Sequence, residues 1–110
     1  MAKILYKSVD ISVDLYEKKR KWKHVDIAYE TDYGITKDEI CKLWEQYCPG
    51  ISKESREVWY DELYVSIMEL PLCGKTIKRV YIQTCFTGDY LAETKEFRKA
   101  FEKYIMERPE

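Results

Sequence analysis

The sequence predicts an α+β protein with a four-stranded, mainly antiparallel sheet made from two β-hairpins and two main helices on one of its faces. Two observations carry this prediction. Apolar and polar residues alternate along four segments, as in half-buried strands, and apolar residues recur at helical spacing along two others. The order of these segments is ββα-α-ββα, and hairpin connections favour antiparallel pairing. Helices on one face of the sheet then bury both apolar patterns.

The first hairpin is predicted over residues 6–16 and 22–31. Its apolar positions alternate with polar ones at Val9, Ile11, Val13, Leu15, Val25, Ile27 and Tyr29. The charged run between the two strands holds neither Gly nor Asn, the usual residues of a tight hairpin turn. We therefore expect the turn to lie in this basic run without a conspicuous turn residue.

The first main helix has the most complete local signals. Thr36 is placed to cap its N-terminus, and Glu39, three residues later, is placed to complete a capping box. Ile35 and Ile40 flank the cap with the spacing of a hydrophobic staple. We expect the Pro49–Gly50 pair to end this helix.

A short second helix is predicted over residues 53–60, with Ser52 as its cap. Alternation then returns from Leu63. Because Pro71 has no N–H to donate to a neighbouring strand, the third strand is expected to end near Leu70.

The last strand and the closing helix follow a turn around Gly74. Alternation over residues 77–86 predicts the fourth strand, in which four residues face inward: Val80, Ile82, Thr84 and Phe86. The closing helix is expected at about 89–107, with either Thr87 or Asp89 as its cap. Its aromatic residues recur at helical spacing, which indicates a buried stripe.

Length and composition limit the class of protein. The chain has 110 residues, of which 45% are hydrophobic, so we expect one globular domain over residues 1–110. No uncharged apolar run is long enough to span a membrane, and the first residues lack the apolar stretch of a secretory signal. We therefore expect a cytoplasmic protein with no membrane partner.

Two compositional features bear on the source and on the thiols. The chain has no Asn and 35% charged residues, a trend of proteins from hot environments, and we hypothesise a thermophilic source. The spacing of Cys41, Cys48, Cys73 and Cys85 does not fit a zinc site, so we interpret the thiols as small apolar core residues. On one helix the first two lie about two turns apart, so a disulfide would need Cys73 or Cys85.

The most conspicuous local feature is a basic run, residues 18–24: Lys18, Lys19, Arg20, Lys21, Trp22, Lys23 and His24. It leaves 14 basic against 20 acidic residues in the rest of the chain, a net charge of −6 there. Cations with an aromatic ring suit phosphate contact and base stacking. The alternatives are contact with a protein and a solvated turn whose lysines keep an edge hairpin from aggregating.

Aromatic residues are the second candidate for binding. The chain has 10 Tyr and 3 Trp residues, and both types are enriched where proteins grip one another. Trp59 and Tyr60 lie between the short helix and the third strand, where one ring is free to stay exposed. The alternative is that these rings fill a small core that has few alanines.

Catalysis is not favoured by the sequence. The single histidine, His24, lies in the basic run, and adjacent carboxylates such as Asp61 and Glu62 do not converge on one point. The sequence predicts no metal and no cofactor. An active site assembled from distant positions would leave no local motif.

The leading functional prediction is a small non-enzymatic binding protein that acts by contact with a protein partner. Its binding residues are expected to be Lys18, Lys19, Arg20, Lys21, Trp22, Lys23, Trp59 and Tyr60. In size, charge and lack of motifs the chain resembles the small inhibitor proteins encoded by phages and archaeal viruses, such as the anti-CRISPR proteins. The alternative prediction is a nucleic-acid-binding protein that uses the basic run.

Overall fold

The computed structural model describes residues 2–16, 20–54, 62–86 and 89–108, and for 14–16, 20–22, 52–54 and 62 it describes only the backbone. Its elements are β1 (Ile4–Tyr16), β2 (Arg20–Thr31), α1 (Lys37–Tyr47), α2 (Pro49–Glu54), β3 (Glu62–Leu72), β4 (Lys75–Phe86) and α3 (Leu91–Met106). No helix in these ranges is long and apolar enough to cross a membrane.

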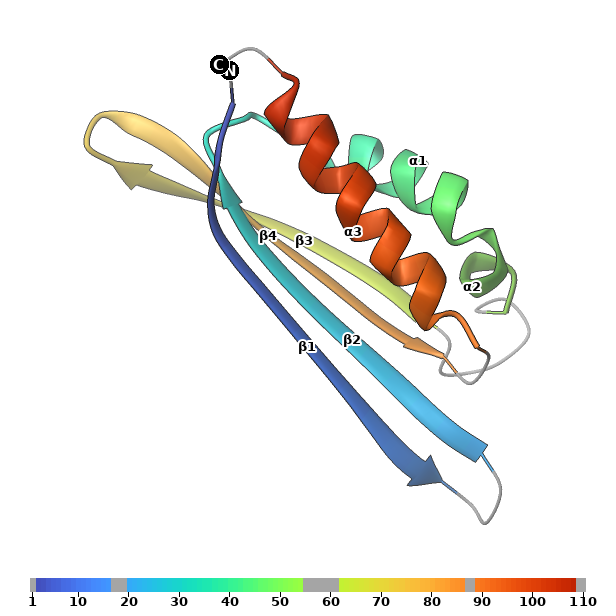
Figure 1. The fold of residues 1–110 in the computed structure, drawn as a ribbon. Coiled ribbons are helices and arrows are strands. Elements are labelled where there is room, and N and C mark those ends of the chain that lie inside the picture. Colours follow the sequence, from blue (N-terminus) through green and yellow to red (C-terminus); the bar gives the residue numbers. More distant parts are fainter. Residues whose placement is uncertain (1, 17–19, 55–61, 87–88, 109–110) are drawn as a thin grey trace.

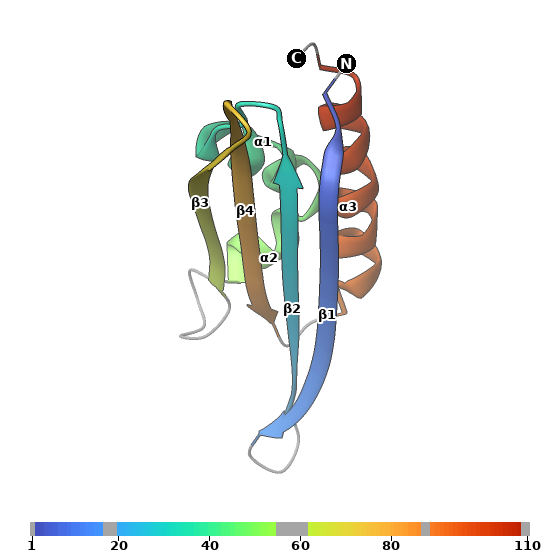
Figure 2. The same ribbon diagram turned by 90° about the vertical axis from the view of Figure 1, so that its left-hand side faces the viewer.

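The strands form one antiparallel sheet in the order β1-β2-β4-β3. Figure 1 shows α1 and α3 side by side on one face of this sheet, and Figure 2 views the sheet from its other face. The predicted α+β class with an antiparallel four-stranded sheet and helices is therefore confirmed.

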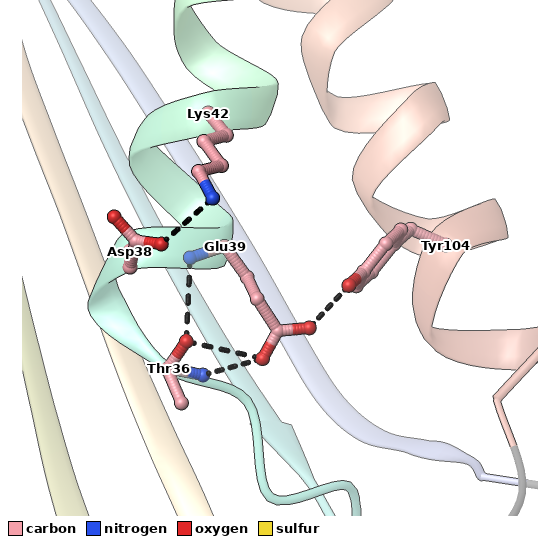
Figure 3. A network of polar contacts seen from close by, with 5 residues as sticks. All are labelled: Thr36, Asp38, Glu39, Lys42 and Tyr104. Atoms are coloured by element: carbon pink, nitrogen blue, oxygen red, sulfur yellow. Dashed lines mark hydrogen bonds and ion pairs between the residues drawn. The ribbon is translucent and has the colours of Figure 1, made fainter.

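The start of α1 has the predicted capping box. The Glu39 N–H donates to the Thr36 hydroxyl at 3.3 Å, and the Thr36 N–H donates back to the Glu39 carboxylate at 3.1 Å (Figure 3). Asp38 and Lys42 add an exposed ion pair of 3.1 Å one turn apart. Ile35 and Ile40 on either side of the cap are both buried in the core. These local contacts hold the first turn because they satisfy N–H groups that have no partner inside the helix.

The second helix begins earlier than predicted. Residues 49–54 form α2, so Pro49 is its first residue and Ser52 lies inside it. Proline suits the first turn of a helix because its missing N–H has no acceptor there and its φ is already helical. The predicted helix over 53–60 lies mostly outside the described residues.

The third strand also departs from the prediction. Pro71 lies inside β3, opposite Thr76 of β4, and the strand ends at Leu72. An edge strand tolerates proline because one of its two sides has no neighbouring strand. The hairpin then turns through Cys73 and Gly74, whose φ values of 49° and 77° are the two positive values that a type I′ turn requires.

The closing helix lacks the predicted side-chain cap. Its N-cap residue is Tyr90, which makes no capping hydrogen bond with its side chain, so Asp89 does not cap it and Thr87 lies outside the described residues. The Thr94 hydroxyl instead donates to the Leu91 carbonyl at 2.8 Å. Tertiary packing of the apolar stripe, rather than a cap, therefore holds this end of the helix.

The core lies between the helices and the sheet. The four predicted inward residues of β4 are all buried: Val80, Ile82, Thr84 and Phe86. Trp44 of α1 meets Phe97 of α3 edge-on at 4.8 Å between ring centroids, and Phe101 lies 4.8 Å from the ring of Tyr29. Part of the aromatic excess of the sequence is thus core packing, and Trp44 is fully buried.

The molecule is elongated because the β1–β2 hairpin extends past the helices (Figures 1 and 2). Its extents are 52 × 23 × 20 Å and its radius of gyration is 14.9 Å, whereas a compact domain of this length has about 13 Å. Among the residues that the structure describes, no helix lies over the end of β1 or the start of β2.

Candidate binding surfaces

The basic run belongs to a strand more than to a turn. Arg20 to His24 lie in β2 and pair in register with Tyr16 to Ser12 of β1, while Lys18 and Lys19 lie outside the described residues. The predicted start of this strand at residue 22 was two residues late. Pairing with β1, which continues to Tyr16, extends the partner strand back into the charged run because antiparallel strands of a hairpin match in length.

Strand geometry places Lys23 and His24 of the basic run on opposite faces of the sheet, because consecutive positions of a strand alternate. Lys23 lies opposite Phe86, which is buried on the helix side, and His24 lies opposite Cys85 on the other side. Lys23 and His24 of the run therefore lie on different faces of the sheet. Trp59 and Tyr60, the other predicted binding residues, lie outside the described residues.

None of the described helices or strands covers the side of the sheet turned away from α1 and α3 (Figure 2). We call it the open face. It consists of the even positions 6–12 of β1, 24–30 of β2 and 64–68 of β3, and the odd positions 79–85 of β4. It forms because the apolar side chains of alternate positions are buried beneath the helices.

Large side chains are exposed on the open face. Tyr6 is 51% exposed, Tyr64 58% and Met68 49%. Tyr6 and Met68 lie in one row across the sheet, separated by Glu30 and Arg79. These side chains give the face apolar area that a partner would bury.

Some charged side chains of the open face form an ion pair and others do not. Arg79 donates from Nε to Glu30 at 2.8 Å, and a guanidinium NH2 group of the same arginine contacts the same carboxylate. This hydrogen bond raises the pKa of Arg79, and the pair is neutral overall. In the next but one row, Asp10 and Asp26 are both exposed and lie directly opposite each other.

Two carboxylates placed opposite each other repel, which costs sheet stability. Neither Asp10 nor Asp26 makes an ion pair within the described part of the chain. The open face therefore combines exposed aromatic and thioether side chains with unneutralised negative charge.

This face was missed by sequence reasoning because it depends on strand register. Alternation along β3 alone separates Tyr64 and Met68 from Leu63, which lies on the other side of the sheet. Nothing local in the sequence shows that Asp10 faces Asp26 or that Tyr6 shares a row with Met68, since these positions follow from the pairing of distant strands. The signal that could have found this face is the alternation of residues along each strand, which defines the face once the order of the strands is known.

A second polar cluster lies where α1 meets α3. The Tyr33 hydroxyl donates to Glu39 at 2.8 Å, the Tyr104 hydroxyl donates to the same carboxylate, and the Arg108 guanidinium lies 4.0 Å above the Tyr104 ring (Figure 3 shows Tyr104 and Glu39). Burial acts to raise the pKa of Glu39, but the hydrogen bonds from Tyr104, Tyr33 and Thr36 outweigh it and hold the pKa below its usual 4.5. The cluster joins the capped end of α1 to the end of α3.

No disulfide joins any two of the four cysteines, Cys41, Cys48, Cys73 and Cys85. Cys48 is buried, as the core interpretation predicts, and burial followed by the nearby Glu93 charge raises its pKa to about 12. Cys73 departs from that interpretation because it is exposed in the β3–β4 turn. Among the residues that the structure describes, no three His, Cys, Asp or Glu side chains come together as a metal site.

Comparison with known proteins adds no further assignment. No protein-family model, no curated protein and no solved structure matches this chain significantly.

Proposed function

We propose that this chain is a small binding protein that acts by protein–protein contact, and that its open face receives a basic surface of the partner. The observation that supports this proposal is the combination on one face of Tyr6, Tyr64 and Met68, each about half exposed, with the Asp10–Asp26 pair. The resemblance in size and charge to viral inhibitor proteins is consistent with it.

The physical argument begins with the apolar part. Tyr and Met side chains are enriched in the cores of protein interfaces, and burying them against a partner releases them from water. Tyrosine rings also accept lysine and arginine cations on their faces. A partner whose basic side chains lie between apolar ones therefore fits Tyr64 and Met68.

The carboxylates contribute specificity and association rate. Asp10 and Asp26 attract a basic surface, and their mutual repulsion is relieved when a cation lies between them. The same charges repel nucleic-acid phosphates. Because Lys23 and His24 lie on different faces and the open face has the Asp10–Asp26 pair, this geometry favours protein contact over nucleic-acid binding.

The test compares variants in a capture experiment. The immobilised chain is exposed to a lysate of its source, and the retained proteins are identified and quantified. The open-face variant carries Tyr64→Ser with Met68→Ser. The matched control is Met106→Ser, which removes a side chain that is 48% exposed at the end of α3. Thermal unfolding of each variant confirms that it is folded.

The expected result is a partner with a basic surface that the wild type and the Met106→Ser variant retain and the open-face variant loses. Asp26→Asn is expected to weaken retention and its dependence on salt. Equal retention of the partner by the open-face variant and by the wild type would contradict the proposal. A second result would also contradict it: nucleic-acid binding at low salt that depends steeply on salt and is lost when the lysines of the basic run are replaced.

A further inference from the structure

We propose that two copies of this chain pair through their β1 strands, antiparallel and edge to edge, about a two-fold axis at Ile11. The partner is a second copy, and the contact lies along the edge of the sheet. It is therefore independent of the protein contact proposed for the open face.

The two edges of the sheet differ in how they resist such pairing. The β3 edge contains Pro71, which cannot donate to an added strand. The β1 edge has a register irregularity between Ile4 and Tyr6, and from Tyr6 to Tyr16 it is eleven regularly paired positions long. A long regular edge has a row of backbone N–H and C=O groups without a strand partner, which is a template for another strand.

Apolar side chains on this edge are exposed on the helix side. Ile11 is 45% exposed and Val13 52%, although Val25, opposite Ile11 on β2, is fully buried. The difference arises because β1 is an edge strand, whereas Val25 lies in β2, which has a neighbouring strand on each side. Pairing about Ile11 places it against Ile11 of the second copy, and Val13 against Val9 of the second copy.

Charge selects this register. With the axis at Ile11, Asp10 lies opposite Ser12 of the second copy and Asp14 opposite Ser8, so no two carboxylates face each other. Moving the axis by one residue places Asp10 opposite Asp10 or opposite Asp14 of the second copy, which is unfavourable. Moving it by two residues shortens the regular overlap from eleven positions to seven.

The position of α3 is compatible with this arrangement. Lys7 contacts Glu102 of α3 at 2.9 Å, so the helix lies along the first half of β1, while the second half extends past it (Figure 2). The two-fold axis brings the extended half of each β1 beside the helix-flanked half of the other. The exposed Ile11 and Val13 then lie within a continuous eight-stranded sheet.

The test measures the mass of the full chain in solution by sedimentation equilibrium over a range of concentrations. The register makes opposite predictions for two variants of one exposed residue. Ser12→Asp places a carboxylate opposite Asp10 of the second copy twice per dimer and is expected to weaken dimerisation about tenfold. Ser12→Lys creates opposite-charge pairs at the same positions and is expected to strengthen it.

Two controls separate this proposal from others. The Tyr64→Ser, Met68→Ser variant is expected to dimerise as the wild type does, so failure of the open-face proposal does not affect this one. Circular dichroism of each Ser12 variant verifies that it keeps the β-sheet content of the wild type. A wild-type chain that stays monomeric from micromolar to near-millimolar concentration would overturn the proposal. A dimer that responds equally to Ser12→Asp and Ser12→Lys would also overturn it, because its contact would lie elsewhere.

Discussion

The two faces of the sheet are built from the same strands and have opposite roles. In β4, Val80, Ile82 and Phe86 are fully buried under the helices, while the alternate positions Arg79, Tyr81 and Gln83 lie on the open face. Alternation along a strand thus separates residues that stabilise the fold from residues that are available for contact. The difference predicts that substitutions on the two faces have effects of very different size.

The largest effect is expected on the helix side. Phe101→Ala removes a fully buried ring that packs 4.8 Å from Tyr29 and 5.8 Å from Phe97. It is expected to lower the free energy of unfolding by about 3–5 kcal/mol, because both transfer energy and packing are lost. Urea unfolding measures this loss. A loss below about 1 kcal/mol would mean that the helix side is not the core.

Adding side-chain volume on the helix side is expected to lower the free energy of unfolding by less than Phe101→Ala does, but by a measurable amount. A Cβ at Gly50 would lie 2.6 Å from Cε1 of Tyr90, so Gly50→Ala requires that ring to move and is expected to cost about 1–3 kcal/mol. Gly34→Ala is the matched control because a Cβ there meets nothing within 4 Å. Equal melting temperatures for the two variants would contradict the close approach of Tyr90.

The Glu39 cluster is expected to make stability depend on pH. Because the folded pKa of Glu39 is lowered, its stabilisation is present above the unfolded pKa near 4.5 and is lost as the pH falls through the folded value. The hydrogen bond to Glu39, with burial, raises the pKa of Tyr104 to about 12, so its contribution is present below pH 10 and is lost between pH 10 and 12.

Two variants measure these contributions by urea unfolding. The stability difference between the wild type and Glu39→Gln is expected to shrink from neutral pH to about pH 3. The alkaline loss is expected to be smaller in Tyr104→Phe than in the wild type. A difference that is constant with pH would show that the cluster does not couple to folding.

The smallest effect on stability is expected on the open face. Tyr64→Ser removes a ring that is 58% exposed, and we expect the free energy of unfolding to change by no more than about 0.5 kcal/mol. Urea unfolding beside Phe101→Ala checks this contrast. A loss approaching that of Phe101→Ala would mean that the open face is part of the core and would remove it as a docking surface.

Local signals in the sequence predicted those parts of the fold that local contacts determine. The capping box was correct because Thr36 and Glu39 are three residues apart and need only a helix between them. The inward residues of β4 were correct because alternation is also local. Pro71 was placed wrongly because its tolerance depends on β3 being an edge strand, which follows from strand order.

The candidate surface was less predictable for the same reason. Charge density drew attention to the basic run, but strand pairing places Arg20 to His24 in β2 and puts Lys23 and His24 on different faces. The Asp10–Asp26 pair and the row from Tyr6 to Met68 arise from register among four strands. A single sequence without that register contains no direct sign of them.

The most direct test of the central claim, that the open face rather than the basic run contacts the partner, is zero-length carbodiimide cross-linking of the captured complex. This reaction joins carboxylates to amines that lie in contact, and mass spectrometry locates the joined residues. The account predicts links from Asp10 or Asp26 to lysines of the partner. Links confined to Lys18, Lys19, Lys21 or Lys23 and partner carboxylates would contradict it.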